Sequence, residues 1–285
     1  MRYVKGRTNL SSTIFVPYDC KNNCPFCTSK QDYKNCSNFS LDKILKSITI
    51  INNNPLVQEF VITGGEPFAN LESLKKIVDT CNKTVYINTT LPKANNINEI
   101  ISYINNTDKI GGINISRHIG FNFNNVCDIK TLDKITKPIR INTVINNNFS
   151  KTAFLDFVYK YGKKKRDINI RADYRKINFD TLKNRDEISI MLQEVFDYIE
   201  TESCIVCNSE YYSMKNKFIV AYHRGLEHSS VIVDDKCYVN DILIKQDGKI
   251  YKDWNCQEDK EFLKWLSIYC LLYTSPSPRD PKTSR

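Results

Sequence analysis

The sequence contains no long hydrophobic run. No apolar stretch approaches the roughly 18 residues that a membrane-spanning helix needs, so we expect no membrane segment. The opening residues, Met1 to Leu10, are polar and basic and lack the apolar core of a secretion signal, which predicts a cytoplasmic protein. With 285 residues, 41% of them hydrophobic and 26% charged, the chain is neither disordered nor fibrous and can bury a sizeable core.

The sequence also lacks a cluster of basic residues. Lysine and arginine number 41 against 32 aspartate and glutamate residues, which gives a net charge of +9. This balance suits an anionic ligand or RNA, but the charges are scattered and no basic stretch is interleaved with aromatic residues. A nucleic-acid partner is therefore not indicated.

Histidine is scarce and cysteine is abundant. Two of the three histidines lie in the segment from His223 to His228, where a metal site competes with an ordinary surface loop. The eleven cysteines are an odd number, so disulfides cannot pair all of them. In a reducing cytoplasm, metal ligation or redox chemistry is the more natural use of so many thiols.

Short β-branched runs alternate with amphipathic stretches over the first 200 residues. The expected strands are Thr13–Pro17, Gln58–Thr63, Thr84–Thr89, Gly112–Ser116, Pro138–Ile145 and Ile168–Ala172. The expected helices are Leu41–Asn52, Leu71–Cys81, Ile97–Ile104, Ile129–Ile135, Lys151–Tyr161 and Arg185–Ile199. Ser40 and Asn70 are candidate N-caps, and Gly162 is a candidate helix stop.

These six β–α units predict a parallel sheet with right-handed crossovers. Six units are too few for a closed eight-fold barrel, so an open partial barrel and a doubly wound sheet are both possible. Either fold places its chemistry at the carboxyl ends of the strands. We expect a core over residues 1–200 on this basis.

The alternation stops after about residue 200. Short strands are expected at Phe218–Tyr222 and Val231–Val233, a hairpin at Ile242–Lys252, and a closing helix at Gln257–Leu271. We treat 201–272 as a small C-terminal α+β extension. The last residues, Tyr273–Arg285, are rich in Pro, Ser and Arg and resemble a translated sequencing adapter, so we expect a disordered tail that is an artefact.

Three cysteines follow the first expected strand. Cys20, Cys24 and Cys27 are spaced by four and three residues, which lets three thiolates in one loop converge on an iron–sulfur cube. A four-iron cluster normally takes four thiolates, so three leave one iron open to a ligand. A zinc site or three free thiols would use the same residues.

A second motif follows the second expected strand. Thr63 is succeeded by Gly64, Gly65, Glu66 and Pro67. Paired glycines allow a ligand to lie against the backbone, and a carboxylate there can hold an ammonium group. A tight turn with an exposed glutamate is the simpler alternative, but a parallel barrel would bring this strand end beside the cysteine loop.

Together these residues resemble the radical S-adenosylmethionine (SAM) superfamily. The resemblance rests on the Cys-x3-Cys-x2-Cys pattern and on the Gly-Gly-Glu-Pro segment, and it extends over about residues 10–200. It implies a partial (β/α)6 TIM-like barrel in which the three cysteines bind a [4Fe-4S] cluster. It also implies that SAM occupies the fourth iron, with the SAM-binding residues Phe26, Gly64, Gly65, Glu66, Ser116 and Asn142.

The resemblance further implies a reaction. A reduced cluster cleaves SAM to methionine and a 5′-deoxyadenosyl radical, which abstracts hydrogen from a substrate. A reductant such as flavodoxin or ferredoxin would supply the electron. The substrate stays open between a small metabolite, a nucleotide and a peptide. The alternative function is a non-catalytic iron–sulfur or zinc protein for electron transfer or binding.

Polar residues near the later strand ends are candidates for substrate contact. They are Arg117, His118, Arg171 and Asp173. The two arginines could hold a phosphate or carboxylate by paired hydrogen bonds, or they could pair with acidic neighbours on the barrel rim.

A second cysteine set begins the extension. Cys204 and Cys207 form a Cys-x2-Cys pair, followed by Cys237 and Cys256. Four such cysteines can enclose zinc or an iron–sulfur cluster, and buried free thiols are the alternative. The region is loosely similar to molybdenum-cofactor GTP cyclases and to members with auxiliary clusters, although the spacing differs from both.

Overall fold

The structure is a computed structural model. The residues described below are 2–6, 10–17, 20–27, 38–121, 123–145, 150–163, 166–171, 188–203, 208–215, 217–223 and 229–272.

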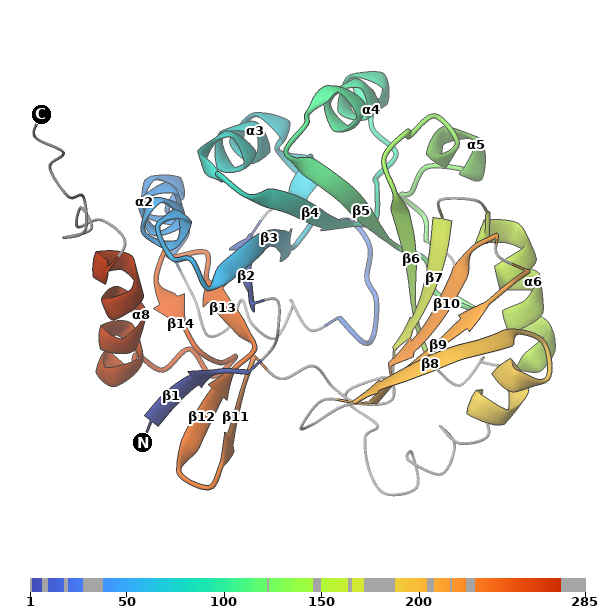
Figure 1. Ribbon diagram of the computed structural model, residues 1–285. Coiled ribbons are helices and arrows are strands. Elements are labelled where there is room, and N and C mark those ends of the chain that lie inside the picture. The colour runs from blue at the N-terminus through green and yellow to red at the C-terminus, as the bar shows by residue number, and fades with distance from the viewer. Residues whose placement is uncertain are drawn as a thin grey trace, which may run out of the picture.

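One large sheet organises the chain. Six consecutive parallel strands form its centre in the order of the sequence. They are β2 (Leu10–Val16), β3 (Val57–Gly64), β4 (Thr84–Thr89), β5 (Ile110–Ser116), β6 (Ile139–Val144) and β7 (Arg166–Arg171). All six were predicted from the sequence within three residues at each end. They curve into an open arc rather than a closed cylinder (Figure 1).

Helices cover the outer, convex face of this arc (Figure 1). They are α2 (Leu41–Asn52), α3 (Leu71–Thr80), α4 (Ile97–Asn106), α5 (Ile129–Leu132) and α6 (Lys151–Tyr161). Because the strand order never reverses and these helices lie on one side, the fold is a partial barrel and not a doubly wound sheet. The predicted fold class is confirmed.

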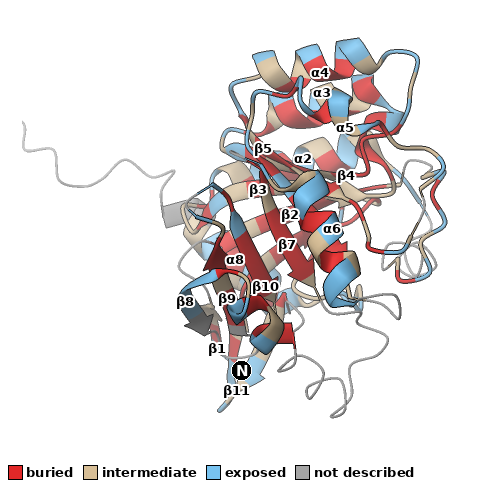
Figure 2. Cartoon of the chain, turned by 90° about the vertical axis from the view of Figure 1, so that its right-hand side faces the viewer, coloured by how far each residue is buried: buried red, intermediate tan, exposed pale blue. Residues whose placement is uncertain are grey.

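Local sequence signals explain where the helices begin. The side chains of Ser40 and Asn70 accept hydrogen bonds from the third residue beyond them and cap α2 and α3, as predicted. In α2 the buried residues Ile44, Ile48 and Ile51 recur at helical spacing and face the sheet. The core therefore lies between the helices and the convex face of the sheet, where Figure 2 shows most of the buried residues.

The C-terminal extension supplies strands to both ends of the same sheet. After β7 come β10 (Ile219–His223), β9 (Asn208–Ser213) and β8 (Asp197–Ser203). Next to β2 come β13 (Asp241–Ile244), which is parallel, and β14 (Ile250–Tyr251), which forms the predicted hairpin with it. Thus strands from 197–251 flank the six-stranded core on either side. A boundary at residue 200 stays a prediction.

The predicted helix Arg185–Ile199 is only partly present. Residues 188–193 are helical, but the chain enters β8 at Asp197. Tyr198 pairs there with Tyr212 of β9, and the two rings lie 5.9 Å apart. Pairing with a neighbouring strand has overridden the helical pattern of the sequence.

A second, three-stranded sheet lies beside the first. Its order is β1 (Arg2–Lys5), β12 (Lys236–Val239) and β11 (Ser230–Val233). The last helix, α8 (Lys260–Leu272), packs against β1 through the rings of Tyr3, Phe262 and Trp265. Among the described residues, every helix is too short or too polar to span a membrane.

Asp259 joins α8 to the rest of the molecule. One of its carboxylate oxygens accepts from the backbone N–H of Phe262, and the other accepts from the Tyr3 hydroxyl at 2.5 Å and the Lys252 ammonium at 2.8 Å. Burial acts to raise the pKa of this carboxyl, but the hydrogen bonds from Lys252 and Tyr3 outweigh it and lower the pKa to about 2. The carboxylate is thus both helix cap and anchor.

Replacing this carboxylate should destabilise the fold. We expect Asp259→Ala to lower the free energy of unfolding by about 2 kcal/mol, the ordinary cost of a helix cap and a charged hydrogen bond. Because the pKa is depressed, the stabilisation should be full above about pH 4 and fade towards pH 2. Urea unfolding followed by circular dichroism measures both.

The adjacent Glu258→Ala is the matched control. Its ion pair with Lys249 is more than half exposed on both sides, so its loss should change the free energy of unfolding much less than the loss of Asp259. Equal effects of the two substitutions would contradict the anchoring role of Asp259.

Candidate active site

The predicted cysteine loop follows β2 at the carboxyl ends of the parallel strands. Among the described residues, Cys20, Cys24 and Cys27 are in no disulfide, and all three are half-buried. The backbone N–H of Cys27 donates to the carbonyl of Cys24 at 3.2 Å, so the last two cysteines lie on one turn. The loop therefore presents three thiols at the end of the barrel where the sequence places the chemistry.

Gly64 fits the end of β3 tightly against the end of β2. Its φ is +126°, and a Cβ atom there would lie 2.1 Å from the carbonyl oxygen of Val16. The next residue, Gly65, donates its N–H to the same carbonyl at 2.8 Å. Glycine is thus required at position 64 because β2 lies so close to the backbone there. From the sequence we expected the glycine to make room for a ligand instead.

The carboxylate of Glu66 lies inside the protein, with only 2% of the residue exposed. One oxygen accepts from the Thr89 hydroxyl at 2.5 Å and the Phe68 N–H at 3.2 Å. The other accepts from the hydroxyl and the backbone N–H of Thr90, at 2.6 and 2.8 Å. Burial raises the pKa of Glu66, and these four donors act against the rise because they stabilise the ionised form.

Thr90 connects Glu66 to the cysteine loop. The side-chain amide of buried Asn22, between the first two cysteines, donates to the Thr90 hydroxyl at 3.2 Å. Burial raises the pKa of the Cys20 thiol, and hydrogen bonds from Asn22 oppose the rise. The negative charge of Glu66 raises it further.

The donor set suits an iron–sulfur cluster. Within the described part of the chain, no three His, Cys, Asp or Glu side chains are gathered closely enough to hold a single metal ion. A four-iron cube makes a different demand, because each iron takes its own thiolate and the sulfurs need not meet at one point. Three half-buried thiols on one loop, none of them in a disulfide within the described chain, satisfy that demand in number and chemistry.

Arg117 is turned away from the barrel interior. Its guanidinium is 4% exposed and donates to the backbone carbonyls of Thr90 at 2.6 Å, Ser116 at 2.8 Å and Cys127 at 3.1 Å. These acceptors are backbone carbonyls, not the acidic side chains considered as its alternative partners; a contact of Arg117 with substrate stays a prediction. The side chain holds the loops after β4 and β5 together.

His118 packs against the cysteine loop. Its ring lies 4.5 Å from the ring of Phe26, edge to face, and its Nδ1 accepts from the backbone N–H of Val144 at 3.1 Å. Burial lowers the pKa of His118 to about 3, and the charge of Arg117 contributes. The imidazole is thus a neutral acceptor that fixes Phe26, Phe121 and Phe123 in one aromatic cluster.

A row of polar side chains lines the concave face of the sheet. The amide of Asn114 donates to Asn88 on the next strand at 2.8 Å, and that of Asn169 donates to Asn142 at 2.9 Å. Ser116 is the neighbour of Asn142 in the register of β5 and β6. The structure thus brings the two predicted residues Ser116 and Asn142 onto one polar surface; their contact with SAM stays a prediction.

Of the remaining substrate candidates, Arg171 lies towards the far end of this surface. Arg171 is half-buried at the end of β7, beside His223 of β10. His223 shares a hydrogen bond of 2.8 Å with Ser209, so it has a use in the described structure other than metal binding. Asp173 lies outside the described residues.

The second cysteine set is described only in part. Cys237 is buried in β12, and Cys256 is half-buried near Phe15 in a small apolar cluster. Cys204 and Cys207 lie outside the described residues. A metal site formed by these four cysteines stays a prediction.

Three important residues were missed at the sequence level. They are Asn22, Thr89 and Thr90, which connect the cysteine loop to Glu66. Thr89 and Thr90 come directly where the predicted strand Thr84–Thr89 ends, and that position was their only signal. Their partners belong to other loops, so local sequence could not identify them.

Comparisons with known proteins agree with this geometry. The family model of the radical SAM superfamily matches residues 14–142. Streptococcus suis SuiB bound to its precursor peptide SuiA has a similar structure, with a TM-score of 0.57 and 14% identity over 92% of this chain and 64% of that chain. SuiB bound to S-adenosylmethionine gives a TM-score of 0.57 and 16% identity over 94% and 66%. No curated protein sequence matches.

An open parallel barrel with a three-cysteine loop at its carboxyl end defines a class of protein. The family match runs from the end of β2 to most of β6, which is the part that carries this loop and the Gly-Gly-Glu segment. Residues 14–142 therefore match the radical SAM superfamily in sequence, and the chain resembles SuiB in fold. It spans about two thirds of the length of the SuiB chains.

Removing the Glu66 carboxylate should weaken the fold around the site. Glu66→Ala leaves four donors without their acceptor, so we expect the free energy of unfolding to fall by about 3 kcal/mol or more. Glu66→Gln keeps one oxygen and should cost less. Urea unfolding of the metal-free protein provides the measurement.

Glu72→Ala on the exposed face of α3 serves as the control for this series. Its partner is Lys75 at 2.8 Å, and an exposed pair of this kind contributes little to the free energy of unfolding. If Glu66→Ala cost no more than Glu72→Ala, the four hydrogen bonds would not stabilise the site.

The buried imidazole should not titrate in the ordinary range. With a folded pKa of about 3, His118 stays neutral down to about pH 4, whereas in the unfolded chain it takes up a proton near pH 6.5. Its contribution to stability is therefore complete above about pH 6.5 and is lost as the pH falls towards 3.

NMR of the imidazole ring nitrogens tests this between pH 8 and pH 5, with His118→Gln to identify the signal. We expect constant chemical shifts for His118. A midpoint near pH 6.5 would show that the ring is not held as an acceptor.

Proposed function

We propose that this chain is a radical SAM enzyme. In this proposal Cys20, Cys24 and Cys27 hold a [4Fe-4S] cluster, and SAM binds beside it. When bound, these groups supply a 5′-deoxyadenosyl radical that abstracts a hydrogen atom from the substrate, with an electron from a flavodoxin or ferredoxin. The observation that carries the proposal is the three-thiol loop tied through Asn22 and Thr90 to the Gly-Gly-Glu segment.

The protein side chains have binding and positioning roles in this proposal. Gly64, Gly65 and Glu66 form the edge where the amino group of SAM would lie. Because the Glu66 carboxylate already accepts four hydrogen bonds, we assign the ammonium contact to the backbone of this segment. Phe26, fixed by His118, provides an apolar face suited to the adenine.

The concave face is the proposed substrate surface. Ser116 and Asn142 are proposed to contact SAM there, and the guanidinium of Arg171 is proposed to contact the substrate, which suits a substrate rich in hydrogen-bonding groups. A peptide is the first of the three substrate classes to test, because one similar structure, SuiB, is bound to a precursor peptide. The second cysteine set is proposed as an additional metal site, for which the Cys204→Ala/Cys207→Ala protein provides the comparison.

Cluster binding and SAM cleavage can be measured separately. After anaerobic reconstitution we expect about four irons per chain, and more if the second site binds metal. With dithionite and SAM, the protein should form 5′-deoxyadenosine. Cys24→Ala should lose most of the iron from this site and all detectable 5′-deoxyadenosine.

Cys81→Ala is the matched control, because this cysteine is a buried thiol at the end of α3. It should leave iron and product unchanged. Unchanged iron in Cys24→Ala would remove this residue from the ligand set. Full iron content without any 5′-deoxyadenosine in the unmodified chain would favour the non-catalytic iron–sulfur protein.

A further inference from the structure

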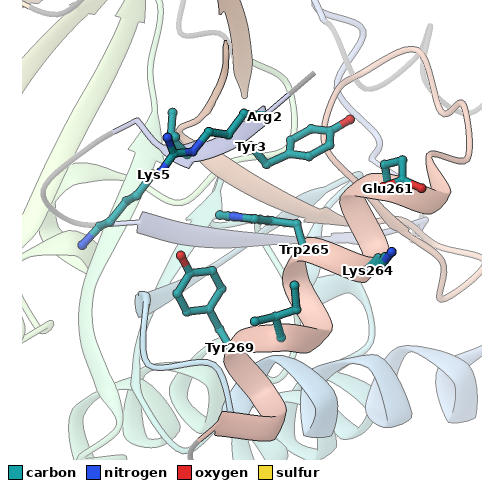
Figure 3. A pocket seen from close by; sticks show the side chains of 9 residues that line it. Arg2, Tyr3, Lys5, Glu261, Lys264, Trp265 and Tyr269 are labelled. Carbon is teal, nitrogen blue, oxygen red and sulfur yellow. The ribbon is translucent and has the colours of Figure 1, made fainter. Parts of the chain in front are cut away.

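A groove lies between β1 and α8, on the outside of the barrel. It has a volume of about 430 Å³, within the range of sites that bind small ligands or short segments. One wall is the strand β1 and the other is the helix face that carries Lys264, Trp265 and Tyr269 (Figure 3). None of these residues has a role in the site described above.

One edge of β1 faces this groove, and no other strand of the described residues lies beside it. β1 is the terminal strand of the three-stranded sheet within the described chain, and its other edge pairs with β12. The N–H groups of Arg2 and Gly6 donate to carbonyls at that paired side, those of Asp235 and Val239. Backbone groups alternate along a strand, so the N–H and C=O of Tyr3 and Lys5 point to the groove side. That edge is a template for one added strand.

Aromatic side chains form the floor of the groove. Trp265 lies 6.0 Å from the ring of Tyr3 and 5.5 Å from the ring of Tyr269, so the three rings form a continuous surface. Trp265 and Tyr269 are only partly buried, and Ile268 beside them is 47% exposed. An extended segment on β1 could place alternate apolar side chains on these rings.

The groove carries more basic than acidic side chains, which favours an acidic ligand. Arg2, Lys5 and Lys264 line it together with a single acid, Glu261. An acidic segment would therefore be attracted and a basic one repelled. The chain's own residues 273–285 carry three basic residues and one acid, the wrong sign for this groove.

We propose that the groove binds an extended acidic peptide segment, which adds to β1 as a strand and packs its apolar residues on Trp265 and Tyr269. A peptide fits better than RNA, because the groove combines a strand edge with one short basic wall. A segment bound here would tether a peptide substrate to the enzyme. This role, unlike the binding itself, rests on the proposed function.

Binding can be measured by fluorescence anisotropy with the metal-free protein. The probe is a labelled eight-residue peptide that alternates glutamate with valine or phenylalanine. A second peptide replaces each glutamate by lysine, a third is methylated on all central backbone nitrogens, and a labelled twelve-nucleotide single-stranded RNA is the fourth probe. The methylated peptide keeps its charge but cannot donate strand hydrogen bonds.

The acidic peptide should bind, and the lysine and methylated peptides should bind at least about tenfold more weakly. Lys5→Glu/Lys264→Glu and the single Lys264→Glu should weaken the acidic peptide by about tenfold or more. The control Lys76→Glu, an exposed change on α3, should leave it unchanged. Circular dichroism confirms that each variant is folded.

Several results would overturn the proposal. They are equal binding of the lysine peptide, equal binding of the methylated peptide, binding of the RNA but not of the acidic peptide, and no binding at all. Because no cluster or SAM is present in this measurement, such a failure would leave the formation of 5′-deoxyadenosine unaffected. Conversely, a chain that binds the peptide but does not cleave SAM would contradict only the proposed function.

Discussion

The site depends on one buried carboxylate and the four donors around it. A carboxylate with 2% exposure is costly to bury unless it is fully hydrogen-bonded, and Glu66 meets that condition through Thr89, Thr90 and Phe68. Phe68 lies in the loop after β3, as Glu66 does, whereas Thr89 and Thr90 lie at the end of β4. The loops after β3 and β4 are therefore held as one body, and Asn22 attaches the cysteine loop to it.

Alternation along the strands then separates structural from accessible polar groups. Ser116 lies on the concave face, and the next residue, Arg117, points the opposite way towards backbone carbonyls. The two residues are adjacent in sequence but differ in surroundings, because successive side chains of a strand face opposite sides of the sheet. Two adjacent polar residues at a strand end thus have different roles. Arg117 stabilises the loops, and Ser116 faces the concave side of the sheet.

The fold was largely predictable because it is built from local signals in a regular order. Helix caps at Ser40 and Asn70 and the six β-branched runs appear in the structure close to where the sequence put them. The contacts of the site were less predictable. Arg117, Asn22 and Thr90 are defined by partners tens of residues away in sequence. The first residues of β8, Asp197–Ile199, were predicted as the end of a helix, because the partner β9 decides their conformation.

Because β10 and β13 border the six-stranded core, the shortest fragment that can fold by itself must include them. The family match ends at residue 142, yet β2 and β7 are each bordered by a strand from the last third of the chain. A fragment that ended at residue 142 would leave β6 and β2 as unpaired edge strands. Unpaired edge strands can pair with other molecules and cause aggregation. Recombinant work on this barrel therefore needs the later strands, even though the recognisable motifs all occur before them.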